Sequence, residues 1–455
     1  MKPNSTLTSG PILRTLLRLS LPNVIAMTMT VLVGIAETRY VGILGTAPLA
    51  AMALVFPFAM LVQMMSAGAM GGGVSSAVSR ALGAGDIARA RTLALHAVVI
   101  GAIAGIVTSI VFIAFGPALY RLLGGSGAVL DEAVRYSAVL FVGAVLIWLV
   151  NTLASILRGT GEMRVPSITL LAMAVAQIAV GGTLGLGLGP VPRLGMPGIA
   201  LGQIVATAGG VAFLTWWLVS GNARLRLGWR GVTLRGDLFA DILKVGALAC
   251  LSPVQSVLTV LIFTGLIARL GVEALAGYGI GQRLEFLLIP IAFGIGVASV
   301  PMVGMAIGAH DYARARRVAW TAGAVSAVNL GVIGLVVSLA PNLWAELFSS
   351  EPVVLEYANQ YLRCAGPGFA FFGLGLTLYF ASQGSGRVLG PVLASTLRLV
   401  VVAGVGLWLA SRDAAAWQFF ALVGSGMAAY GVSTAAAIRL TRWTPGTAAS
   451  VVRAS

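Results

Sequence analysis

Charged side chains are scarce in this sequence. Asp, Glu, Lys and Arg make up 9% of the 455 residues, whereas 58% of the residues are hydrophobic. Soluble domains carry about a quarter of charged residues, so the composition excludes a water-soluble globular protein. The mean hydropathy of +0.97 supports the same conclusion. Long apolar runs satisfy their backbone hydrogen bonds in lipid as helices, and we therefore expect an all-α integral membrane protein.

The residue types that build disulfides, metal sites and most hydrolytic active sites are also rare. There are two histidines and two cysteines, and Cys250 and Cys364 lie far apart in or beside apolar segments. Neither a disulfide nor a metal site is expected from such a pair. The sequence contains no H-E-x-x-H or G-x-S-x-G pattern. We therefore expect no enzyme, no metal and no cofactor.

Acidic residues are half as frequent as basic ones, 14 against 29, which gives a net charge of +15. In a soluble chain this excess would suggest a nucleic-acid partner, but its distribution along the chain indicates otherwise. The apolar runs predict twelve spans, near residues 12–42, 47–70, 92–116, 132–157, 165–189, 196–219, 238–267, 274–300, 318–341, 353–382, 388–411 and 414–438. Twenty Lys and Arg residues fall in the predicted loops of one side and seven in those of the other.

Basic residues concentrate on the cytoplasmic side of membrane proteins. We therefore expect a multi-pass protein of a bacterial plasma (inner) membrane with both termini in the cytoplasm. The excess positive charge is explained without nucleic acid, and membrane lipids are the expected surroundings. A short polar N-terminus followed by a full-length span is not a cleaved signal peptide.

One segment occurs twice. Residues 78–94, VSRALGAGDIARARTLA, return as residues 303–319, VGMAIGAHDYARARRVA, and ten of the seventeen positions are identical. The same offset of 225 carries the pattern Gly-x-Gly-x-x-x-x-Pro from 159–166 to 384–391. Glycine-rich loops can bind anions, but both copies lie between long apolar runs, which favours a connector between helices.

The repeat predicts two pseudo-symmetric six-helix lobes around a central cleft. Six spans per half place both halves in the same orientation, as parallel repeats. We assign residues 1–220 to the N-terminal lobe, 221–241 to a cytoplasmic linker and 242–455 to the C-terminal lobe.

The ordered motifs resemble the multidrug and toxic compound extrusion (MATE) family of efflux transporters. The residues that carry the likeness are Pro22, Glu37–Gly45, Leu49–Ala51, Arg80–Asp86 with Arg89 and Arg91, and Leu157–Glu162. The resemblance implies a twelve-helix exporter that moves organic, often cationic or drug-like small molecules outward by alternating access. It implies coupling to inward flow of protons or sodium ions, and we expect a monomer.

The sequence departs from the family pattern at its ion-binding positions. Glu37 stands where members commonly have Asp, while Gln177 and Gly181 stand where many have Asn and Asp. Acidic residues that sodium-coupled members place on spans seven and ten are not evident, since these segments read Pro253-Val254-Gln255 and Phe371-Phe372-Gly373. The resemblance therefore favours protons over sodium.

Charged side chains inside spans are costly and mark functional candidates. The predicted spans contain Glu37, Arg39, Arg283, Glu285 and Arg398. Glu37 is expected either to exchange a proton or to cap its helix or pair with an arginine. Glu285 is expected to pair with Arg398 or with Arg283, and a Glu285–Arg398 pair would serve as a structural lock or as a proton-controlled switch. We assign ion coupling to Glu37, Glu285 and Arg398.

Polar and aromatic side chains on the spans are candidates to line the cargo cleft, or alternatively to pack helices together. The cleft candidates are Gln177, Gln255, Arg283, Tyr278, Phe286 and Phe372. A competing function on the same scaffold is a flippase or exporter of a lipid-linked or amphipathic metabolite. A channel uses similar spans, but the duplication favours a transporter.

Overall fold

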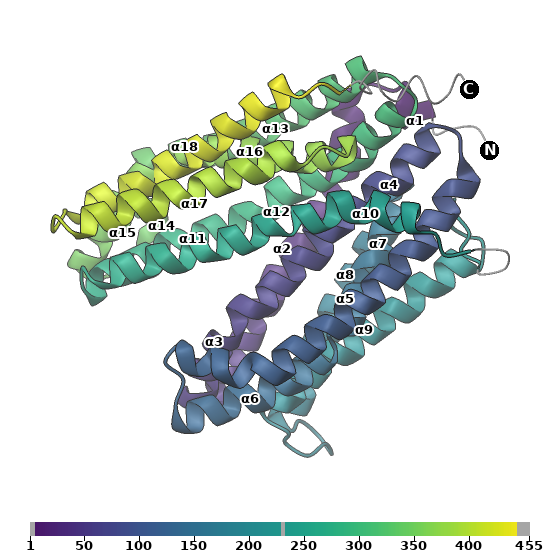
Figure 1. The fold of residues 1–455 in the computed structure, drawn as a ribbon. Helices are drawn as coiled ribbons and strands as arrows, with labels where there is room; N and C mark the ends of the chain where they lie inside the picture. The colour runs from purple at the N-terminus through teal and green to yellow at the C-terminus, as the bar shows by residue number, and fades with distance from the viewer. Residues whose placement is uncertain (1–4, 229–232, 444–455) are drawn as a thin grey trace. The chain divides into compact units, whose positions relative to one another are not determined.

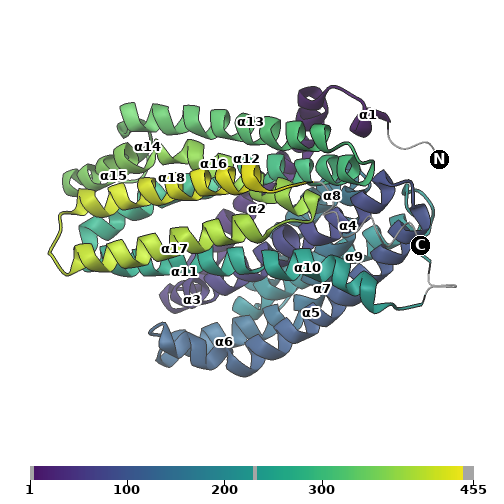
Figure 2. The ribbon, with the colours of Figure 1, turned by 45° about the horizontal axis from the view of Figure 1, so that its top comes forward.

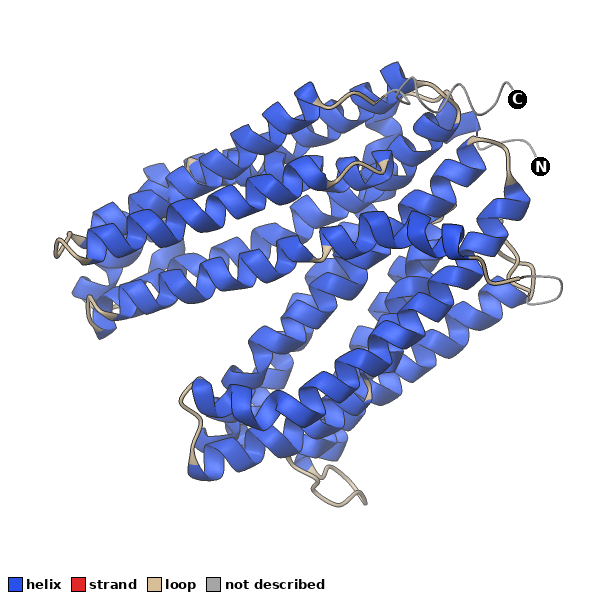
Figure 3. Cartoon of the chain, in the orientation of Figure 1, coloured by secondary structure: helices blue, strands red, loops and turns tan. Residues whose placement is uncertain are grey.

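The computed structural model describes residues 5–228 and 233–443 (Figure 1). All regular elements in these ranges are helices (Figure 3), as the composition predicts. The first half comprises α1 (Ser5–Thr8), α2 (Ile12–Leu44), α3 (Thr46–Gln63), the π-helix η1 (Met64–Met70), α4 (Gly71–Gly83), α5 (Ile87–Leu122), α6 (Gly127–Val142), α7 (Ala144–Gly159), α8 (Arg164–Leu186) and α9 (Met196–Val219). The second half comprises α10 (Gly236–Ala249), α11 (Leu251–Ala268), α12 (Val272–Gly308), α13 (Tyr312–Leu339), α14 (Asn342–Ala345), α15 (Pro352–Ala365), α16 (Gly368–Ser385), α17 (Leu389–Ala410) and α18 (Ala416–Leu440).

These helices account for all twelve predicted spans. Ten segments of the described chain are long and apolar enough to cross a membrane singly, and two bent helix pairs raise the number to twelve. The bent pairs are α6 with α7, at 44°, and α15 with α16, at 54°. Each is the fourth span of its half. The second bend lies at Gly366 and Pro367, where proline has no backbone N–H to continue the helix.

The helices form two compact units. The N-terminal unit contains the described residues of 21–81 and 86–246, and the C-terminal unit contains those of 5–20, 82–85 and 247–443. Residues 5–20 and 82–85 therefore group with the second half of the chain, and residues 221–228 and 233–246 group with the first.

Within the C-terminal unit, α13, α16 and α18 lie side by side (Figures 1 and 2).

The fold follows the sequence repeat in detail, and the two connectors are built alike. Asp86 caps α5 by accepting a hydrogen bond from the Arg89 backbone N–H at 2.8 Å. Asp311 caps α13 through the Arg314 backbone N–H at the same distance. An N-cap aspartate satisfies an otherwise unpaired helix donor, which explains why both copies keep Asp at this position. The arrangement supports the interpretation of the loop as a helix connector.

The repeated glycines allow close helix contact in each unit. A Cβ on Gly159 would lie 3.0 Å from Cβ of Val78, and a Cβ on Gly384 would lie 2.9 Å from Cβ of Val303. Val78 and Val303 are equivalent positions of the repeat. Small residues at helix contacts let backbones approach in membrane proteins, so the duplicated sequence encodes the same helix contact twice.

Candidate functional site

Glu37 of α2 is the buried carboxylate of the N-terminal unit. Its side chain is 8% exposed. The Gln177 amide Nε2, on α8, donates a hydrogen bond to Glu37 Oε1 at 2.7 Å. The structure thus brings together two residues that lie 140 positions apart and that the sequence singled out separately. Gly181, one helical turn after Gln177, supplies no side chain, so the amide is the polar partner from this helix.

No cation neutralises Glu37 within the described ranges 5–228 and 233–443. Arg39 is exposed and forms no ion pair with it there. The hydroxyl of buried Tyr136, on α6, lies within electrostatic range of the Glu37 carboxylate. A carboxylate whose hydrogen-bond partner is a neutral amide can exist in either protonation state without breaking a fixed ion pair. Such a group is chemically suited to exchange a proton.

Glu285 of α12 has a partner that differs from the predicted one. Its Oε1 accepts a hydrogen bond from the Tyr361 hydroxyl, on α15. Among the described residues it forms no salt bridge with Arg398 or Arg283. The predicted ion pair is therefore not formed in this structure. The fully buried Tyr361 hydroxyl, rather than an arginine, supplies the hydrogen bond to the carboxylate.

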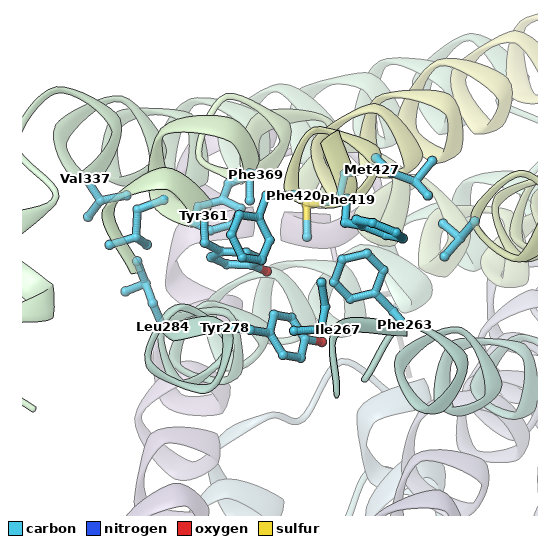
Figure 4. Close-up of a cluster of buried hydrophobic side chains, with 14 of the residues drawn as sticks. Phe263, Ile267, Tyr278, Leu284, Val337, Tyr361, Phe369, Phe419, Phe420 and Met427 are labelled. Carbon is cyan, nitrogen blue, oxygen red and sulfur yellow. The ribbon is translucent and has the colours of Figure 1, made fainter. Parts of the chain in front are cut away.

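Tyr361 lies in the large apolar core of the C-terminal unit. Figure 4 shows Tyr361 close to Tyr278 and Phe420. The ring centroids of Tyr361 and Tyr278 are 5.4 Å apart, and those of Tyr361 and Phe420 are also 5.4 Å apart. Sequence analysis missed Tyr361, because nothing in the local pattern of a half-apolar helix links it to a residue 76 positions earlier.

Arg398 of α17 lies over an aromatic ring. Its Cζ is 5.8 Å from the centroid of Phe372, on α16. A predicted ion-coupling residue, Arg398, and a predicted cleft residue, Phe372, are thus in contact in the C-terminal unit. Gln255 of α11 approaches α17 at another residue, since its Nε2 donates to Thr396 Oγ1 at 2.7 Å.

The remaining cleft candidates do not gather at one point. Tyr278 is buried among aromatic residues, and its hydroxyl accepts a hydrogen bond from Gln282 Nε2 at 3.1 Å. Arg283 is exposed and lies 5.1 Å from the ring of Phe348. Phe286 is half-buried on α12. Tyr278 thus contributes mainly to packing, whereas Arg283 faces away from the core.

A charged cluster that the sequence did not indicate joins α4, α5 and α10. Asp241 accepts hydrogen bonds from Arg80 at 2.6 Å and from Arg89 at 3.0 Å. Nearby, Nε2 of fully buried His96 accepts the Arg235 backbone N–H at 2.9 Å. These contacts hold the start of α10 on the N-terminal unit, which explains why residues 233–246 group with it.

Across residues 5–228 and 233–443, no group of three or more His, Cys, Asp and Glu side chains is arranged to hold a metal ion. The candidate site of the N-terminal unit is the Glu37 carboxylate with the Gln177 amide. That of the C-terminal unit is the Glu285 carboxylate with the Tyr361 hydroxyl, and the Arg398 guanidinium lies apart from this pair. This chemistry fits binding and proton exchange.

Two relatives match this chain over most of its length. A protein of Shewanella oneidensis named FAD transporter is 27% identical over 409 residues, which cover 88% of this chain and 89% of the relative. The probable multidrug resistance protein NorM of Thermotoga maritima is 25% identical over 386 residues, covering 84% and 82%. These relatives span nearly the same length as this chain.

Solved structures share the fold. A MOP-superfamily transporter from Pyrococcus furiosus superposes with a TM-score of 0.89 at 22% identity, covering 97% of this chain and 98% of that chain. An outward-facing multidrug resistance MATE family transporter gives a TM-score of 0.86 at 22% identity, covering 96% and 97%. The MatE family model matches residues 22–182 and 249–408, one segment in each half of the repeat. This multi-pass membrane chain therefore belongs to the MatE family of transporters.

Proposed function

We propose that the protein is a secondary active antiporter that exports organic compounds by alternating access in exchange for protons. The observation that carries the proposal is the Glu37–Gln177 contact, in which a neutral amide donates a hydrogen bond to a buried carboxylate. Family membership supports the transport function. The contact supports Glu37 as the group that binds and releases the coupling proton.

The surroundings of Glu37 favour a proton over a sodium ion. Hard cations are held by several oxygen ligands at once. The Gln177 side chain presents its N–H group to Glu37, so its nitrogen occupies a place that an oxygen ligand would need. In the part of the chain that the structure describes, no second carboxylate joins Glu37 in a ligand cluster. A proton needs only the carboxylate itself.

Two candidate functions differ in the charge of the exported molecule. Export of cationic, drug-like compounds is supported by Glu37, whose ionised form attracts a cation, and by the relatives named multidrug resistance and multidrug export proteins. Export of an anionic, amphipathic metabolite is supported by the Shewanella oneidensis relative named FAD transporter. It is also supported by Arg398, a guanidinium with no ion pair within residues 5–228 and 233–443.

Transport in proteoliposomes tests the proposal. A fluorescent organic cation and a flavin nucleotide are each loaded, and export is driven separately by an imposed pH gradient and an imposed sodium gradient. We expect the pH gradient to drive export and the sodium gradient to leave it unchanged. Export driven by sodium alone, or by neither gradient for either cargo, would contradict the proposal. Glu285→Gln tests the second carboxylate, which we propose also contributes to coupling.

A further inference from the structure

Arg398 carries a positive charge within a membrane span and forms no salt bridge among residues 5–228 and 233–443. It lies nine residues after the start of α17 at Leu389 and twelve before its end at Ala410, so it is close to the middle of the helix. Arginine at this depth is unfavourable and is normally paired or functional. The position therefore needs an explanation from its surroundings.

The described surroundings supply no hydrogen-bond acceptor for the Arg398 guanidinium. Over residues 5–228 and 233–443, Arg398 takes part in no hydrogen bond or salt bridge, and its Nε atom is buried without an acceptor. The Glu285 carboxylate lies within electrostatic range, but its hydrogen bond goes to Tyr361. The Nη groups of the guanidinium are thus left without a hydrogen-bond acceptor among the described residues.

Aromatic side chains surround this guanidinium. Phe372 lies 5.8 Å from Cζ, and the hydroxyls of Tyr278 and Tyr430 are within electrostatic range. The aliphatic part of Arg398 runs along α18, where a Cβ on Gly426 would lie 3.9 Å from Cγ. Arg398 and Phe372 are both half-buried rather than sealed from solvent.

We propose that Arg398 and Phe372 form a subsite that binds the acidic group, carboxylate or phosphate, of an aromatic cargo molecule. A guanidinium matches both oxyanions with two parallel hydrogen bonds, and the neighbouring rings accept a planar group. The subsite rests on the proposed transport function and names the cargo class. Its occupant is an organic anion with a planar aromatic part.

Binding to the purified full-length protein tests the subsite without any ion gradient. Two probe pairs differ only in the acidic group: riboflavin 5′-phosphate against riboflavin, and 1-pyrenebutyrate against 1-pyrenebutanol. Hydrogen bonds to charged groups correspond to about a tenfold to hundredfold change in affinity. We expect the wild-type protein to bind the anionic member of at least one pair more tightly by this factor, and the preferred pair identifies phosphate or carboxylate.

Variants assign the preference to the side chain. Arg398→Gln is expected to abolish the preference for the anion, and Arg398→Lys to retain part of it. Arg412→Gln is the matched control, because Arg412 also lies over an aromatic ring, Trp408, at 4.9 Å but is exposed beyond the end of α17. Equal affinities within both pairs in the wild type, failure to bind either anion, or a preference that survives Arg398→Gln would overturn the proposal.

Thermal stability separates this role from a structural one. A charged side chain without a salt-bridge partner in a membrane span is unfavourable, so Arg398→Met is expected to unfold at the wild-type temperature or above. A large decrease would show that Arg398 has a structural partner and would overturn the subsite. Loss of gradient-driven transport with intact anion preference would instead count against the proton-coupling function alone.

Discussion

Asp241→Asn tests the charged cluster that holds α10 on the N-terminal unit. The carboxylate of Asp241 bridges two arginines, at 2.6 Å to Arg80 and 3.0 Å to Arg89. The Asn side chain has nearly the same shape but no charge. The substitution therefore removes both ion pairs while leaving the packing of α10 almost unchanged.

The expected loss comes mostly from the Arg80 contact. The Arg80 and Asp241 side chains are 18% and 28% exposed, whereas Arg89 is 47% exposed. Exposed ion pairs contribute less than about 1 kcal/mol, and hydrogen bonds to charged groups in more buried places about 1.5–3 kcal/mol. We therefore expect Asp241→Asn to reduce the free energy of unfolding by about 2 kcal/mol, with Arg89 adding little because solvent screens it.

Unfolding of the purified protein in detergent, followed by loss of the folded peak in size-exclusion chromatography, measures this effect. Asp237→Asn is the control, because Asp237 lies on the same helix and pairs with Arg235 at 3.0 Å with both side chains more than half exposed. We expect the control to behave as the wild type. Equal unfolding of Asp241→Asn and the wild type, or equal losses in both variants, would refute the reasoning.

Two further predictions concern packing and the second carboxylate. Gly73→Ala is expected to lower the free energy of unfolding by about 1–3 kcal/mol, because the added Cβ would lie 2.7 Å from the Gly246 backbone N. Gly209→Ala is its control in the same unfolding assay. It is expected to be neutral or stabilising, because a Cβ there would meet open space. Tyr361→Phe is expected to cost about 1–3 kcal/mol by removing the hydrogen bond to Glu285, and adding Glu285→Gln should recover part of it. A neutral Gly73→Ala, or a double variant less stable than Tyr361→Phe, would contradict these assignments.

The sequence predicts the helices well because their signal is strong. The sequence shows directly both the apolar runs long enough to span a membrane and the excess of basic residues in the loops of one side. The duplicated segment around Asp86 and Asp311 also predicts the matching caps. The bends inside the two fourth spans are weaker signals, because each half of the bent span is apolar and only Gly143 in one span and Gly366-Pro367 in the other mark the breaks.

The side-chain contacts are only partly predictable. Intramembrane position and family resemblance select Glu37 and Gln177, and the structure places them in contact. The same reasoning pairs Glu285 with Arg398 because opposite charges attract, and it overlooks Tyr361. Because a tyrosine is neutral, its charge does not identify it in the sequence as the hydrogen-bond partner of a carboxylate. Which tyrosine contacts Glu285 is decided by helix packing.

Uphill export by Glu37 variants in proteoliposomes under an imposed pH gradient is the measurement that tests the central claim most directly. Glu37→Gln cannot bind and release a proton, whereas Glu37→Asp keeps the carboxylate, and Arg39→Gln changes an exposed neighbour on the same helix. We predict that Glu37→Gln loses uphill export but still exchanges cargo downhill, while Glu37→Asp and Arg39→Gln keep uphill export. Uphill export at the wild-type rate by Glu37→Gln, at equal protein content, would contradict the account.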